Sequence, residues 1–132
     1  MPVPGRSRAT WPWVAFAVVA VVGQCVALYL PDPGPVTAGF DFPGFDKVVH
    51  LAIFAVPTFA LLRVVPPRWV VLVAMLAQAV ASELIQGTLL PHRSGDPLDA
   101  AADLGGILVG LALAYWTRRR PGSAYRGPTA AG

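Results

Sequence analysis

Residues 98–116 read LDAAADLGGILVGLALAYW, an apolar run with two aspartates near its start and with Arg118, Arg119 and Arg120 just after it. As a helix, a run of this length crosses the roughly 30 Å hydrocarbon core of a bilayer, because each residue adds about 1.5 Å. The stretch therefore predicts a membrane-spanning helix with charges of opposite sign at its two ends.

Three further apolar runs precede this one in the sequence. We predict four transmembrane helices, from Trp13 to Leu30, from Val48 to about Val65, from Trp69 to about Leu90 and from Leu98 to Trp116. Hydrophobic residues make up 55% of the chain and charged residues only 13%, against roughly 25% charged residues in a typical soluble domain. The short connections between the later helices favour antiparallel neighbours. The predicted fold class is all-α, an integral membrane bundle of four transmembrane helices.

Charge is distributed unequally between the two ends of these helices. The acidic residues all fall at one end: Asp32, Asp41, Asp46, Glu83, Asp96, Asp99 and Asp103. Most of the basic residues fall at the other end: Arg6, Arg8, Arg63, Arg68, Arg118, Arg119, Arg120 and Arg126. Since cytoplasmic loops are enriched in Lys and Arg, we predict that both termini are cytoplasmic. Residues 1–12 then form an N-terminal cytoplasmic segment, and residues 118–132 form a mobile basic tail.

The first apolar run also resembles the start of a secretory signal peptide, because Arg6 and Arg8 precede it. The run is longer than a typical signal core, no small-x-small cleavage site ends it, and three more apolar runs follow. We therefore predict that it is retained as a helix. The basic residues lie beside membrane segments, where anionic lipid headgroups are their natural counterparts. Membrane lipids are thus the predicted partners, and nucleic acid is not.

The informative residues are the polar ones inside the apolar runs. An ionised side chain at mid-membrane costs about 2.5 to 3.5 kcal/mol, so such residues face the bundle interior or a water-filled cavity. Three predicted helices carry polar pairs whose members share one helix face. The pairs are Asp46 and His50 with Lys47 beside them, Glu83 and Gln86, and Asp99 and Asp103. We predict that they form one pocket that opens to the outside, with Arg93 and Asp96 at its rim.

Structural roles compete with this interpretation for several residues. The aspartates nearest the helix starts can act as N-terminal caps, which applies to Asp46, Asp96 and Asp99. Lys47 and Arg93 are placed to extend their charges toward water, and His50 can be an interfacial histidine. Gln86 either supports Glu83 or links two helices. Glu83 is hardest to explain structurally, because a carboxylate at that depth requires a partner.

Read in order, these residues form the motif Asp46-Lys47-x-x-His50, Glu83-x-x-Gln86, Arg93 and Asp99-x-x-x-Asp103-x-x-Gly106-x-x-x-Gly110. The spacing of Gly106 and Gly110 predicts close helix packing. Over about residues 10–117, the motif resembles the VanZ-like family of small bacterial membrane proteins. The resemblance implies a VanZ-like four-helix domain, over residues 13–117, in the bacterial cell membrane. The founding member of that family is associated with low-level resistance to the glycopeptide teicoplanin.

The chain departs from the expected family pattern at two positions. The pattern has Asn where this chain has Asp103, and often Tyr where it has Phe54. Aspartate keeps a polar acceptor but adds a titratable group, which allows protonation, pairing with Lys47 or Arg93, or altered chemistry. A site role is therefore transferred to Asp103 less securely than to the other positions.

The favoured function is a cell-envelope factor that binds or alters a lipid headgroup or a lipid-linked cell-wall precursor. In this hypothesis Lys47 and Arg93 attract phosphate, while His50, Glu83 and Gln86 bind the rest of the headgroup. No cofactor is predicted for this function.

Two other function classes remain open. In an intramembrane enzyme, His50 and Glu83 act as acid and base or, with Asp99 and Asp103, hold a divalent metal, although the spacing matches no specific metal motif. A small proton-coupled transporter is the third class. Against a transporter, no polar path reaches the cytoplasmic half of any predicted helix. A homo-oligomer could supply the path that one chain lacks.

Overall fold

The computed structural model describes residues 10–30, 43–90 and 96–119, and within them it contains helices and no strand. The helices are α1 (Trp11–Tyr29), α3 (Phe45–Val64), α4 (Arg68–Thr88) and α5 (Pro97–Arg119). Each of the four is long and apolar enough to cross a membrane. The predicted all-α fold with four membrane-spanning helices is confirmed, and the chain is a multi-pass membrane protein.

Two helix boundaries differ from the predicted ones in ways that affect the polar residues. α3 begins at Phe45 rather than at Val48. Gly44 precedes it with a φ of 85°, a left-handed conformation that glycine adopts without steric cost. α5 continues to Arg119, beyond the predicted end at Trp116, and basic residues in a last helical turn are favourable because of the helix dipole.

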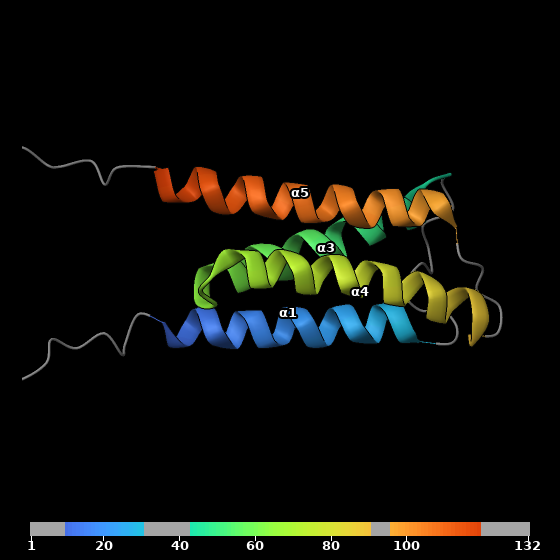
Figure 1. Cartoon of the computed structure of the whole chain (residues 1–132), viewed down its shortest axis with the longest axis horizontal. Coiled ribbons are helices and arrows are strands. Elements are labelled where there is room, and N and C mark those ends of the chain that lie inside the picture. Colours follow the sequence, from blue (N-terminus) through green and yellow to red (C-terminus); the bar gives the residue numbers. More distant parts are fainter. Residues whose placement is uncertain (1–9, 31–42, 91–95, 120–132) are drawn as a thin grey trace, which may run out of the picture.

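The helices lie side by side with their long axes roughly parallel, and α3 packs against both α1 and α5 (Figure 1). α4 contacts all three other helices. The start of α1, the turn between α3 and α4, and the end of α5 lie at the same end of the bundle, on the left in Figure 1. The cytoplasmic location of this end stays a prediction.

The two ends of the bundle differ in charge. We call the left end in Figure 1 the basic end, because its charged residues within the described helices are Arg63, Arg68, Arg118 and Arg119. We call the other end the acidic end. The carboxylates of the described part of the chain all lie in the half of the bundle nearer this end: Asp46, Glu83, Asp96, Asp99 and Asp103.

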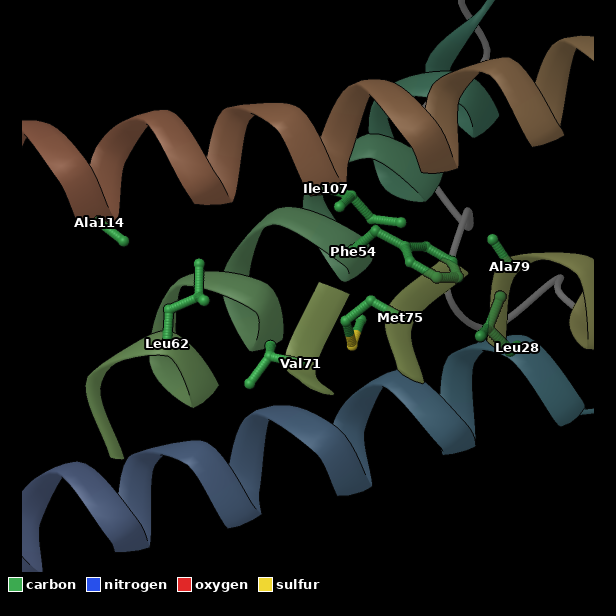
Figure 2. Packing of buried hydrophobic residues seen from close by; sticks show 8 residues of the cluster. All are labelled: Leu28, Phe54, Leu62, Val71, Met75, Ala79, Ile107 and Ala114. Carbon is green, nitrogen blue, oxygen red and sulfur yellow. The ribbon is translucent and has the colours of Figure 1, made fainter. Parts of the chain in front are cut away.

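A narrow apolar core runs between the helices (Figure 2). Its buried members are Leu28, Phe54, Leu62, Val71, Met75, Ala79, Ile107 and Ala114. Many equally large apolar side chains lie on the outside of the bundle, such as Val19, Val80 and Leu108. Helices that are apolar all round are typical of membrane spans, so lipid rather than protein covers these outer surfaces.

α5 approaches α3 through Gly106 and Gly110. A Cβ atom on Gly106 would lie 2.3 Å from the carbonyl oxygen of Leu51, and one on Gly110 would lie 2.6 Å from that of Ala55. Both distances are too short for any side chain, so the two helix backbones are in direct contact, as in small-xxx-small helix pairs. This contact places Asp103, one turn before Gly106, directly against α3.

Candidate functional site

Three helices bring polar side chains together at the acidic end. α3 contributes Asp46, Lys47 and His50, α4 contributes Glu83, and Asp96, Asp99 and Asp103 come from α5 and the residue before it. Arg93, the predicted rim residue, lies outside the described residues.

The most deeply buried contact of this cluster joins His50 and Asp103. His50 Nδ1 lies 2.8 Å from Asp103 Oδ1, and the Asp103 side chain is completely buried. His50 Nε2 lies 3.8 Å from Asp99 Oδ2. Asp103 Oδ2 is buried and has no hydrogen-bond partner within the described helices. The pair therefore fixes the orientation of the imidazole ring and leaves one carboxylate oxygen available.

Glu83 reaches the same place from α4. Potential ligand atoms of His50, Glu83 and Asp103 all lie within 4.8 Å of one another, and we call these three residues the buried triad. Glu83 Oε1 is buried and has no hydrogen-bond partner in the part of the chain that the structure describes. Because α4 ends at Thr88, Glu83 lies about 7.5 Å below the end of its helix.

Lys47 lies nearer the end of the bundle and is surrounded by carboxylates. Its Nζ lies 2.6 Å from Asp46, 2.9 Å from Asp96 and 2.9 Å from Asp99, and we call these four residues the rim network. The Leu98 backbone N–H donates to Asp96 at 2.9 Å, and this bond, followed by the Lys47 ammonium, lowers the pKa of Asp96. Lys47 thus already has its counter-charges and is poorly placed to attract a phosphate.

The cluster as a whole is acidic, because the buried triad and the rim network contain five carboxylates against Lys47 and His50. Such a site attracts cations and hydrogen-bond donors. An imidazole nitrogen with two carboxylates also suits a divalent ion such as Zn²⁺ or Mn²⁺. Among the described residues, those of the buried triad fit a metal, whereas Asp99 is engaged with Lys47.

Gln86 does not join the buried triad. Its Nε2 donates to the backbone carbonyl of Leu28 at 2.9 Å, so it ties α4 to α1. Gln78 ties the same two helices together by donating to the Tyr29 hydroxyl at 3.0 Å. Of the two roles considered for Gln86, the observed contact is the helix-linking one.

A groove between α4 and α5, which the sequence did not predict, leads to the buried triad. It has a volume of about 240 Å³ and is lined by Ala79, Val80, Glu83, Leu84, Ala100 and Leu104. Val80, Leu84 and Leu104 are exposed on the outer surface, so the groove opens toward lipid. Among the described residues that line it, Glu83 is the one polar residue. The alanines on the two facing helices were the only sequence signal for it.

No protein-family model, curated protein or solved structure matches the chain. The resemblance to the VanZ-like family therefore depends on the motif residues. Within the described helices, six of those residues lie together at the acidic end: Asp46, Lys47, His50, Glu83, Asp99 and Asp103.

Proposed function

We propose that this chain is a VanZ-like cell-envelope protein of the bacterial cytoplasmic membrane that binds a membrane lipid or a lipid-linked cell-wall precursor at its acidic end. The observation that carries the proposal is the groove between α4 and α5, which joins the lipid-facing surface to Glu83. The excess of arginine at the opposite end supports an outward-facing acidic end. Headgroups of the outer leaflet are at the right depth to reach it.

The groove suits an acyl chain and the cluster suits a polar headgroup. Inside a membrane, an apolar groove holds a chain through van der Waals packing rather than through the hydrophobic effect. Glu83 Oε1 and Asp103 Oδ2 are buried acceptors that have no hydrogen-bond partner among the described residues, and such groups are costly to leave unsatisfied. Hydroxyl or amino groups are the donors that satisfy carboxylates. We therefore propose a headgroup that is recognised through its O–H or N–H groups, and not through its phosphate.

Blocking the groove is expected to reduce lipid binding. Ala100→Leu fills the groove without changing a charge, so we expect about fivefold less specifically retained lipid, equivalent to about 1 kcal/mol. The measurement is mass spectrometry of lipids that remain with the full chain after purification. Ala112→Leu is the matched control, because Ala112 is exposed on the same helix and is absent from the groove lining.

Equal lipid retention by the two leucine variants would contradict a binding role for the groove. The resistance part of the proposal is tested in parallel by teicoplanin susceptibility of a host that carries wild type, Ala100→Leu or Ala112→Leu at matched membrane levels. We expect protection by wild type and by Ala112→Leu, and its loss in Ala100→Leu. An absence of protection by all three would detach the chain from glycopeptide resistance while leaving the binding result intact.

A second candidate function is an intramembrane enzyme, which the buried triad favours. His50, oriented by Asp103, is suited to accept or donate a proton. The triad also suits a divalent metal. Two ligands bound at about 2.1 Å lie about 3.0 to 3.4 Å apart in octahedral or tetrahedral geometry, close to the 2.8 Å between His50 Nδ1 and Asp103 Oδ1. Two carboxylates would balance the charge of the ion.

Metal titration of the chelator-stripped full chain tests this candidate. We expect one Zn²⁺ or Mn²⁺ per chain by elemental analysis, with affinity at least about 10-fold weaker in Glu83→Gln, since even indirect changes at metal sites cost that much. Asp46→Asn is the control, because Asp46 is half exposed and pairs with Lys47 rather than with the buried triad. Equal weakening in both variants, or no uptake by wild type, would exclude the metal form of the enzyme.

A further inference from the structure

A second charged cavity lies at the basic end, far from the buried triad. It has a volume of about 660 Å³ beside the turn between α3 and α4. Its charged lining residues are Arg63, Arg68 and Arg118. Arg63 and Arg68 flank the turn, whereas Arg118 belongs to the last turn of α5. Helix packing therefore brings three guanidinium groups around one cavity.

Two of these arginines are held in place by contacts with uncharged groups. Arg63 lies over the rings of Trp13 at 4.9 Å and Phe59 at 5.0 Å, and it donates a hydrogen bond to Thr117. Its Nε is buried without a hydrogen-bond partner in the described helices. Arg118 donates to a backbone carbonyl of α3. Each guanidinium has five N–H donors, so these contacts position the groups and leave donors available.

The positive charge around the cavity has no counter-charge in the described part of the protein. Within residues 10–30, 43–90 and 96–119, the ion pairs all involve Lys47 or His50 at the acidic end. Three like charges around one cavity repel one another. An anion that enters relieves this repulsion, and guanidinium groups match the oxygens of a phosphate in bidentate geometry.

An apolar groove next to the cavity favours a lipid phosphate over a free phosphate. The groove is small, with a volume of about 30 Å³; it shares Leu62, Arg68 and Arg118 with the cavity and reaches Leu111 and Ala114 of α5. A soluble anion would make no use of this apolar surface, whereas one or two carbons next to a lipid phosphate would lie against it. Basic pockets between transmembrane helices are typical sites for anionic lipid headgroups.

We propose that this cavity binds the phosphate group of an anionic membrane lipid, with Arg63, Arg68 and Arg118 as its ligands. The lipid would bind beside the turn between α3 and α4 and bridge that turn to the end of α5. This site is independent of the function proposed for the acidic end, because the two sites share no residue.

The test compares two single arginine variants of the full chain by native mass spectrometry in detergent. The probes are phosphatidylglycerol and phosphatidylcholine of the same chain length. Arg68→Gln removes a lining charge whose side chain makes no hydrogen bond or ion pair with the described residues. We expect it to weaken phosphatidylglycerol binding about 10-fold, as lost charged hydrogen bonds would. Arg119→Gln removes the same charge from a residue that stacks over Tyr115 at 4.1 Å and does not line the cavity. We expect it to change binding less than twofold.

Three results would overturn the proposal. Equal weakening by both variants would assign the binding to diffuse surface charge. Equal affinity of wild type for the two lipids would exclude recognition of the anionic headgroup. Full displacement of phosphatidylglycerol by millimolar inorganic phosphate would identify a soluble-anion site instead of a lipid site. If Arg68→Gln does not fold, Arg68→Lys serves in its place, because it keeps the charge and loses only the bidentate geometry. We expect Arg68→Lys to weaken phosphatidylglycerol binding by more than Arg119→Gln does, and in that case binding equal to wild type would also overturn the proposal.

Discussion

Gly106→Ala is expected to destabilise the bundle by about 3 kcal/mol, which is the upper range for overpacking a closely packed site. The added Cβ would lie 2.3 Å from the Leu51 carbonyl oxygen and 2.9 Å from Phe54 Cβ. Because one of these atoms belongs to the backbone of α3, the clash is relieved only if α5 moves away. The measurement is the free energy of unfolding of the purified protein, from denaturing-detergent titration followed by circular dichroism.

The neighbouring glycine provides a control that differs by one position. A Cβ on Gly105 would meet only Leu51 Cδ1, at 3.8 Å, which is an ordinary van der Waals contact. Alanine is also the better helix former by about 1 kcal/mol, so Gly105→Ala should leave the free energy of unfolding unchanged or raise it slightly. Equal losses in Gly105→Ala and Gly106→Ala would show that direct backbone contact between α3 and α5 does not hold the bundle together.

Asp103→Leu is expected to destabilise the protein by about 3 kcal/mol, because it leaves the buried His50 without its partner. Asp103→Asn retains an acceptor for the imidazole and should cost less than about 1 kcal/mol. Asparagine is also the residue that the resemblance to the VanZ-like family leads us to expect at this position. The same unfolding titration measures both variants.

The double variant His50→Leu/Asp103→Leu separates the hydrogen bond from other effects of the leucine. Replacing both members of a buried polar pair with apolar residues is often close to neutral. We therefore expect the double variant to recover at least half of the stability that Asp103→Leu loses. A double variant as unstable as Asp103→Leu would attribute the loss to steric conflict with α3, and the hydrogen bond would then contribute little.

Much of the candidate site was predictable, because helix periodicity is a local property. The four-residue spacing of Asp99 and Asp103 places both on one face of α5, and both lie near His50. The depth of Glu83 in its apolar run predicted a group in need of partners, and it lies with His50 and Asp103. In contrast, the predicted start of α3 at Val48 was three residues late, since the helix begins at Phe45, directly after the left-handed backbone conformation of Gly44.

The spacing of residues along the chain did not show which groups Lys47 and Gln86 contact. Lys47 is held by three carboxylates, two of which come from α5 and the residue before it. Gln86 shares a helix with Glu83 but donates to α1. In both cases at least one partner lies on another helix, and the local sequence pattern does not give the distance to that helix.

The sequence by itself determined the helical class, the four spans, the charge difference between the two ends and the face that each polar pair occupies. These properties depend on residues within one helix, where rise and periodicity are constant. Only the tertiary structure decided which faces meet. The rotation of each helix about its axis depends on packing across helices, here on the contact of Gly106 and Gly110 with α3. That packing created the buried triad, the groove beside it and the arginine cavity at the other end.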